Sequence, residues 1–461
     1  MSSPIRQAQP PLEFIPPTLN PTMVRGVQWL LSPYLRSRTA LRQIDTENVE
    51  TLVDLYRQFQ AGKIRLLLAF RHPSADDPLC LAHLIWKVMP KVAKQRGMPL
   101  KHLPHAHFMY DRGIPLWAGE RMGWLYSQLG GTPIHRGKID LVGLRSARDL
   151  FVNGQYPLAA APEGATNGHS EVISPLEPGI SQLAFWGVED IQKAGRTEQV
   201  LILPIGIKYH YITPPWTAVE QLLSGLERDI GVTSVTVATG NETELYERLY
   251  RLGGHLLVKM EEFYTRFYHR TLPDATSELP TSHEHLMTRL NALLDVALHV
   301  AEEYFGLQSK KGTFIDRCRR LEQAGWDYIY RDDLKPETIS PIDRGLADRV
   351  AEEADLRVWH MRIVESFVAV TGNYVREKPS AERFAETALL MWDMIARIKG
   401  GSPFNRPRLG DQAALVTIGK PLSVSDRWQS YQGGRRHAKQ AVAELTQALQ
   451  TELENLIGAS T

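Results

Sequence analysis

The stretch 64–78 constrains the fold of this chain most, because it joins a strand pattern to a helix pattern through a short polar turn. Residues 64–70 are apolar except for Arg65, and the run has the length of a buried strand. Asp77-Pro78 then marks a helix start, with Asp77 as N-cap and Pro78 at the first helical position. Strand-to-helix turns of this kind predict an α/β fold, in which chemistry sits at the carboxyl ends of strands.

This turn contains a histidine and a carboxylate, His72 and Asp77. A neutral imidazole accepts a proton from a hydroxyl group when a partner fixes its tautomer and stabilises the imidazolium. A carboxylate does both, so the pair predicts general-base catalysis. The structural alternative is that His72 only ends the strand and Asp77 only caps the helix.

Three later stretches give this pair a context. They read Gly-Gly-Thr-Pro-Ile-His-Arg-Gly at 130–137, Ala-Ala-Pro-Glu-Gly-Ala-Thr-Asn at 160–167 and Leu-Ile-Leu-Pro-Ile-Gly-Ile at 201–207. With the His72 turn, in this order and spacing, they resemble the four motif blocks of the glycerophospholipid acyltransferases, the family of lysophosphatidate and glycerol-phosphate acyltransferases. The resemblance covers about residues 20–215. The matching positions are His72, Asp77, Arg136, Glu163, Gly164 and Pro204.

The resemblance implies a mostly parallel sheet flanked by helices and an enzyme that transfers a fatty acyl group. The donor would be acyl-CoA or acyl carrier protein, and the acceptor a hydroxyl group of 1-acyl-glycerol-3-phosphate, with no metal or further cofactor. His72 and Asp77 would be catalytic. The implied acceptor-binding residues are Arg136, Arg71, Glu163 and Gly164.

The sequence also departs from the family pattern near the acceptor-binding groups. Arg71 stands where Asn is usual, and Ala165 follows Glu163-Gly164 where Thr is usual. The acceptor therefore stays open between lysophosphatidate, glycerol 3-phosphate and another lysophospholipid.

The composition is that of an ordinary globular protein. Hydrophobic residues make up 43% of the 461 residues and the net charge is +1, which gives no drive toward nucleic acid. Two cysteines, Cys80 and Cys318, favour a reducing cytoplasm. No apolar run approaches the ~18 residues of a membrane span. We therefore expect a cytoplasmic protein that lies on the inner face of a membrane.

Two stretches without acidic residues predict contact with anionic partners. One extends from Phe14 to Ile44 and contains a basic, Trp-bearing helix pattern at 23–36, which suits a membrane interface. The other extends from Pro78 to Tyr110 and would attract an anionic donor, an acidic carrier protein or lipid head groups. The alternatives are a helix packed on its own domain and a solvated basic face.

Strand and helix patterns stop alternating after about residue 210, where long helical patterns begin. A strand pattern returns at 413–422 and resembles the family's last core strand. We therefore predict a helical insertion; the alternative ends the sheet at Thr233–Thr239 and makes the remainder a C-terminal helical block. The predicted segments are an irregular N-terminal segment with amphipathic helices (1–61), a catalytic α/β domain (62–210), the helical insertion (211–410) and a last strand and helix that complete the catalytic domain (411–461).

Three other functions compete with acyl transfer. A thioesterase or lipase-like hydrolase lacks support, because the sequence has no Gly-x-Ser-x-Gly motif. A non-catalytic lipid-binding or scaffolding homologue stays open because of the change in the third motif block, where Ala165 follows Glu163-Gly164. A metal enzyme would use His102, His105 and His107, although Pro104 interrupts that run.

Overall fold

The computed structural model describes most of the chain. It covers residues 5–135, 140–233, 241–273, 278–309, 311–334, 339–367, 373–402 and 405–458, apart from the side chains at 116, 117 and 120. These residues form two compact units. The sheet unit contains 13–135, 140–212 and 411–458, and the helical unit contains 5–12 and the described part of 213–410.

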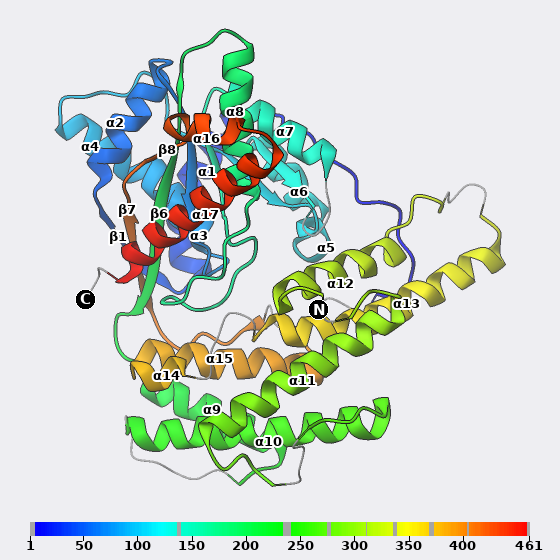
Figure 1. Ribbon diagram of the computed structural model, residues 1–461. Helices are drawn as coiled ribbons and strands as arrows, with labels where there is room; N and C mark the ends of the chain where they lie inside the picture. Colours follow the sequence, from blue (N-terminus) through cyan, green and yellow to red (C-terminus); the bar gives the residue numbers. More distant parts are fainter. Residues whose placement is uncertain are drawn as a thin grey trace. The chain divides into compact units, whose positions relative to one another are not determined.

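The described part of the sheet unit contains an eight-stranded, mostly parallel sheet (Figure 1). Its strand order is β1-β7-β6-β2-β5-β3-β4, and β8 pairs with β6. Strands β7 and β8 run antiparallel to β6, whereas β2, β3, β4, β5 and β6 are parallel to one another. The predicted α/β class with a mostly parallel sheet flanked by helices is confirmed. The strands are β1 (Leu41–Glu47), β2 (Ile64–Phe70), β3 (His107–Asp111), β4 (Gly131–Ile134), β5 (Leu158–Ala160), β6 (Gln199–Tyr211), β7 (Gln412–Ile418) and β8 (Leu422–Ser423).

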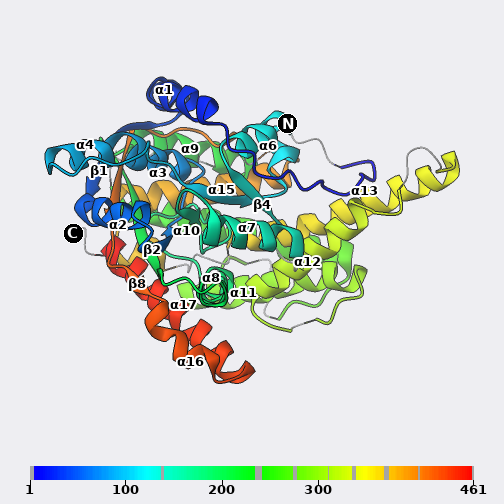
Figure 2. The same ribbon diagram turned by 90° about the horizontal axis from the view of Figure 1, so that it is seen from above.

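Helices cover both faces of this sheet, which explains the continuous apolar run in β2. Leu66, Leu68 and Phe70 belong to one core cluster, and Leu67 and Ala69 to the other. A strand buried on both faces is apolar at nearly every position, and Arg65 is the exception in β2. Figure 2 shows α1 and α17 on opposite sides of the strands. The first face is covered by α1 (Pro21–Arg38), α2 (Val49–Gln60), α3 (Asp77–His83), the π-helical turn Leu84–Val88 and α4 (Met89–Gln95), and the second by α7 (Leu141–Asn153), α8 (Gly179–Lys193), α16 (Trp428–Gln432) and α17 (Arg435–Gly458).

The N-terminal part of the chain differs from the prediction. The described part of the predicted segment 1–61 is divided between the units: α1, β1 and α2 belong to the sheet unit, and residues 5–12 belong to the helical unit. Strand β1 pairs with β7 at the edge of the sheet. Most of its residues are polar, so its sequence pattern does not indicate a strand.

Residues 411–458 return to the sheet after the helical stretch. Strand β7 lies between β6 and β1, and α17 packs on the second face of the sheet. Apart from residues 5–12, the described part of the helical unit thus lies between β6 and β7 in the sequence. Of the alternative strand Thr233–Thr239, residues 234–239 lie outside the described part of the chain.

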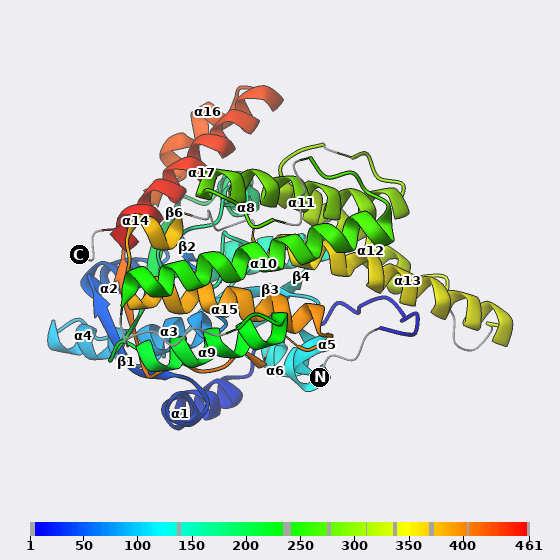
Figure 3. The ribbon, with the colours of Figure 1, turned by 90° about the horizontal axis from the view of Figure 1, so that it is seen from below.

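The helical unit contains long helices, three of which, α9, α10 and α15, lie side by side (Figure 3). None of the helices described in either unit is long and apolar enough to cross a membrane. The remaining short helices of the sheet unit are α5 (Ile114–Ala118) and α6 (Glu120–Gln128). The helices of the helical unit are α9 (Trp216–Ile230), α10 (Glu242–Tyr268), α11 (His283–Tyr304), α12 (Phe314–Ile329), α13 (Pro341–Glu365), α14 (Tyr374–Glu377) and α15 (Ala381–Ile398).

Ion pairs with buried carboxylates join successive helices of this unit. The Arg289 guanidinium is fully buried and makes two hydrogen bonds to the Glu261 carboxylate, one of them 3.0 Å long. Such pairs tolerate only one register of the two helices, because a shift would leave a charge buried and unpaired. The pairs are Glu227–Arg248 (α9 and α10), Glu261–Arg289 (α10 and α11), Glu302–Arg317 (α11 and α12) and Glu322–Arg362 (α12 and α13).

We predict that Arg289→Met lowers the free energy of unfolding of the helical unit by about 3–5 kcal/mol, because it leaves the Glu261 carboxylate buried without a partner. The double variant R289M/E261M removes both charges and should recover most of this loss. Urea unfolding followed by circular dichroism measures both effects. Arg349→Met, which breaks an exposed pair with Glu352, is the control and should change stability by about 0.5 kcal/mol or less. A double variant as unstable as R289M would contradict the prediction.

Candidate active site

The turn between β2 and α3 folds around the side chain of Asp77. The N-cap of α3 is Asp76, and Asp77 is the first helical residue, so the predicted capping role of Asp77 is wrong. Its carboxylate points back into the turn instead, where Oδ2 accepts the backbone N–H of Ser74 at 2.7 Å. The same oxygen lies 3.0 Å from Nδ1 of His72.

His72 and Asp77 therefore form a hydrogen-bonded pair at the carboxyl end of β2. Asp77 is fully buried, whereas 23% of the His72 side chain is exposed. A carboxylate accepts hydrogen bonds, so the proton lies on Nδ1 and Nε2 is the basic atom of the ring. Among the described residues, no hydrogen bond engages Nε2. The Phe70 ring packs against the imidazole in an edge-on arrangement. The geometry suits proton abstraction by Nε2.

The structure adds Tyr209, which the sequence patterns did not predict as a site residue. Strand β6 pairs with β2 as far as Phe70 and continues beyond it, which carries Tyr209 to the turn. Its hydroxyl donates to Oδ1 of Asp77 at 2.5 Å and lies 3.6 Å from Sγ of Cys80. Burial, with the Asp77 charge as a second cause, raises the pKa of Tyr209 well above its usual value, so the hydroxyl stays protonated. One sequence feature could have identified this residue: Tyr209 stands in an apolar strand pattern, and a buried tyrosine hydroxyl needs a hydrogen-bond partner.

Glu163 also lies beside the turn, but in a position that differs from the prediction. Its buried carboxylate accepts the backbone N–H groups of His72 at 2.8 Å and Ser174 at 3.0 Å, and the Asn167 amide at 3.3 Å. Burial raises the pKa of Glu163, while the charge of Arg71 and the backbone N–H groups of His72 and Ser174 oppose the shift. Because this carboxylate is buried and accepts these three hydrogen bonds, Glu163 holds the His72 backbone and is poorly placed to hold the hydroxyl groups of an acceptor.

Gly164 serves the same loop through its backbone. Its φ of +74° lies in the left-handed region, and an added Cβ would come within 2.2 Å of Oε1 of Glu177. A residue with a Cβ would be strained in this conformation and would displace the end of the Glu177 side chain. The described contacts thus give Gly164 a structural part in the loop, and its contact with an acceptor stays a prediction.

Arg71 is not placed to bind a phosphate group, contrary to the prediction. Its side chain is completely buried. Its terminal nitrogens donate to four backbone carbonyls, which anchors the loop 169–172 to β6. The acceptors are the carbonyl oxygens of His169 (2.6 Å), Val172 (2.6 Å), Ile207 (3.1 Å) and Ser170.

Arg136 lies outside the described residues, but the strand that precedes it, β4, is described. Strand β4 ends at Ile134, and the next residue, His135, donates its N–H to Asp140 at 3.0 Å. The end of β4 is three strands from β2, which corresponds to about 14 Å across the sheet.

The histidines at 105 and 107 pack inside the sheet unit. Nδ1 of His105 accepts Trp86 Nε1–H at 3.2 Å, and its Nε2–H donates to the Leu129 carbonyl at 2.9 Å. His107 is buried and its Nδ1 binds the Gly130 carbonyl at 3.0 Å. Both ring nitrogens of His105 take part in hydrogen bonds within the protein, which argues against the hypothesis of a metal enzyme. The described residues also contain no cluster of three or more potential metal ligands.

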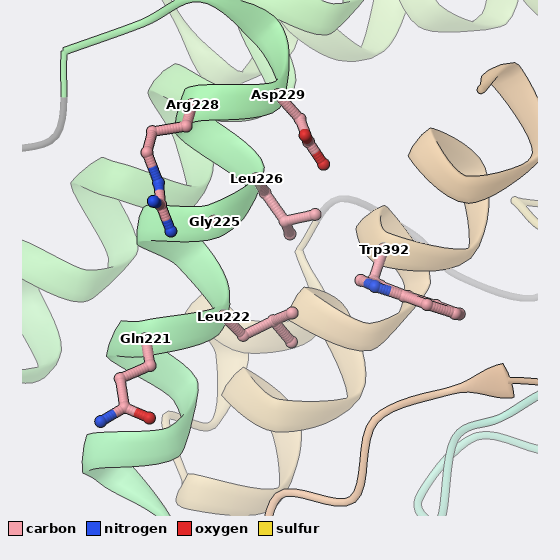
Figure 4. A pocket seen from close by; sticks show the side chains of 7 residues that line it. All are labelled: Gln221, Leu222, Gly225, Leu226, Arg228, Asp229 and Trp392. Carbon is pink, nitrogen blue, oxygen red and sulfur yellow. The ribbon is translucent and has the colours of Figure 1, made fainter. Parts of the chain in front are cut away.

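One pocket in the helical unit lies between α9 and α15 (Figure 4). Leu222 and Leu226 point toward Trp392 across it. None of its lining side chains is a histidine, cysteine or hydroxyl group, so we assign it no chemistry. The lining residues are Gln221, Leu222, Gly225, Leu226, Arg228, Asp229 and Trp392.

In comparisons with known proteins, no family model, curated protein or solved structure matches this chain. The function is therefore argued from the site itself.

We predict that acid destabilises the sheet unit through His105. Burial lowers the pKa of His105 to about 4, from an unfolded value near 6.5. Between these values the unfolded chain binds a proton that the folded chain does not, so stability falls as the pH drops from 6.5 to 4, by about 3 kcal/mol at most. His105→Gln should show a shallower fall in urea unfolding between pH 6.5 and 4.5. His102→Gln, at an exposed histidine, is the control. If the stability of H105Q fell with pH as steeply as that of the wild type, the prediction would be refuted.

Proposed function

We propose that this protein is an O-acyltransferase of phospholipid synthesis. It moves a fatty acyl group from a thioester, acyl-CoA or acyl carrier protein, to the free hydroxyl of 1-acyl-glycerol-3-phosphate at the inner face of a membrane. The observation that supports the proposal best is the 3.0 Å contact between Nδ1 of His72 and the buried carboxylate of Asp77. It leaves a partly exposed imidazole with one basic nitrogen at the carboxyl end of β2.

In the proposed reaction, Nε2 of His72 takes the proton from the acceptor hydroxyl. The oxygen attacks the thioester carbonyl carbon, a C–O bond forms, and the C–S bond breaks. The proton then passes from the imidazolium to the leaving thiolate. Asp77 stabilises the transient imidazolium, and Ser74 N–H and Tyr209 O–H keep its carboxylate oriented. A general base of this kind contributes about 10²–10⁴-fold in rate.

The described nucleophilic side chains favour direct transfer over a covalent acyl-enzyme. Cys80 lies near the turn, but it is fully buried, and burial raises the pKa of its thiol so that no reactive thiolate forms. The Ser74 hydroxyl accepts the N–H of Asp76 at 3.2 Å within the turn. A hydrolase that forms an acyl-serine would need its serine beside the histidine on a Gly-x-Ser-x-Gly turn, which this sequence lacks.

The choice of acceptor depends on the phosphate group. Because the guanidinium of Arg71 is occupied by backbone carbonyls, Arg136 is the remaining arginine that the resemblance implies for phosphate. Guanidinium binds phosphate through paired hydrogen bonds, which favours a phosphate-bearing acceptor. Lysophosphatidate is our first choice and glycerol 3-phosphate the second.

We predict that His72→Ala lowers kcat by about 10²–10⁴-fold, because the general base is lost. The assay supplies a long-chain acyl thioester with lysophosphatidate, glycerol 3-phosphate or a lysophospholipid, and identifies products by mass spectrometry. His102→Ala, at an exposed histidine, should keep wild-type turnover. Near-normal turnover in H72A would remove His72 from the chemistry. Release of free fatty acid without acylation of any acceptor would favour the hydrolase.

We predict that Arg136→Ala raises the KM for lysophosphatidate about tenfold or more while kcat changes less, because a charge-assisted contact of about 1.5–3 kcal/mol is lost. The phosphate-free monoacylglycerol should be a poor acceptor for the wild type, and R136A should not worsen its KM. Arg57→Ala, at an exposed arginine on α2, is the matched control. An unchanged KM in R136A would overturn the phosphate-binding role.

A further inference from the structure

Helix α1 buries one apolar face and exposes another. Val24, Leu31 and Leu35 are buried in the sheet unit. On the outer side, three large side chains lie close together along the helix and remain at least half exposed. They are Trp29 (77%), Leu30 (51%) and Tyr34 (51%). A tryptophan and a tyrosine in such positions are typical of side chains that sit at the boundary between water and lipid.

The charged residues of α1 itself all have one sign. Arg25 and Arg36 are exposed on α1, and Arg38 is exposed at its end. No acidic residue occurs between Phe14 and Ile44. This charge complements anionic lipid head groups. It disfavours a second copy of α1 as the partner, because a symmetric contact would bring two sets of arginines together.

Helix α1 also ends on the side of the sheet where His72 lies. It begins after Asn20, whose N–H donates to the Gln128 carbonyl just before β4 starts. It leads into β1, whose first residue, Leu41, pairs with Gln412, and Gln412 pairs with Tyr211 beyond the carboxyl end of β2. The 18-residue helix is about 27 Å long. Its basic end therefore lies at the same end of the sheet as the turn, beside β1, which is three strands from β2.

We propose that α1 lies on an anionic lipid surface, with Trp29, Leu30 and Tyr34 at the boundary between head groups and acyl chains. Its arginines contact the head groups. The proposal deepens the acyltransferase function and rests on it for its meaning in catalysis, because a lipid acceptor would then reach the site along the surface. Binding itself requires no turnover, so the two proposals can fail separately.

The test is co-sedimentation of the full chain with vesicles of phosphatidylcholine alone or mixed with phosphatidylglycerol. We expect the wild type to bind the anionic vesicles and salt to weaken this binding. The triple variant W29S/L30S/Y34S should have an affinity for these vesicles that is lower by about tenfold or more, because three apolar side chains no longer enter the interface. R25Q/R36Q should lose affinity for the anionic vesicles.

Two control variants show whether binding depends on this face of α1. I342S/L346S/L356S removes three exposed apolar side chains of α13 and should bind as the wild type does. H72A should also bind normally, which distinguishes failure of the chemistry from failure of the lipid contact. Wild-type binding by W29S/L30S/Y34S, or no binding of the wild type to anionic vesicles, would overturn the proposal. Conversion of a wild-type dimer to a monomer by that triple variant would assign the face to a second copy instead.

Discussion

The candidate site depends on one buried charge, the carboxylate of Asp77. An ionised carboxylate without exposure to water is costly unless donors replace the water it loses. Three donors do so here: the Ser74 amide and the His72 ring from the turn, and the Tyr209 hydroxyl from β6. The carboxylate thereby ties the turn to a strand more than a hundred residues later. The orientation of the imidazole follows from this arrangement.

Two further buried charges extend the same network to the loop after β5. Glu163 accepts the backbone N–H of His72, and Arg71 donates to carbonyls of residues 169–172 and to Ile207. Strands β6, β2 and β5 are neighbours, so these contacts link the carboxyl ends of three adjacent strands. Because backbone groups satisfy most of these charges, the network fixes the loops themselves. Its members support the position of His72 and are less suited to bind a substrate directly.

The sequence predicted the parts of this site that local patterns encode. The apolar run 64–70 and the polar turn after it lie within fifteen residues, so β2, α3 and the His72–Asp77 pair could be placed. The carbonyls that Arg71 binds lie 98 residues or more away, and Glu163 lies 91 residues from His72. A motif gives the type of side chain but not its direction. Tyr209 required the register of β6 against β2. Strand β1 was missed because an exposed edge strand lacks a strong apolar pattern.

The register of β6 and β7 also explains how the sheet accommodates about 200 intervening residues. Tyr211 pairs with Gln412, and the Ile212 N–H donates to the Asp411 carbonyl at 3.0 Å. The chain therefore leaves and re-enters the sheet unit at adjacent positions, where a short hairpin loop would also fit. The entropic cost of closing a loop grows only slowly with its length. A stretch that forms its own core, with registers set by Arg–carboxylate pairs, can therefore replace such a loop without disturbing the strands that carry the site.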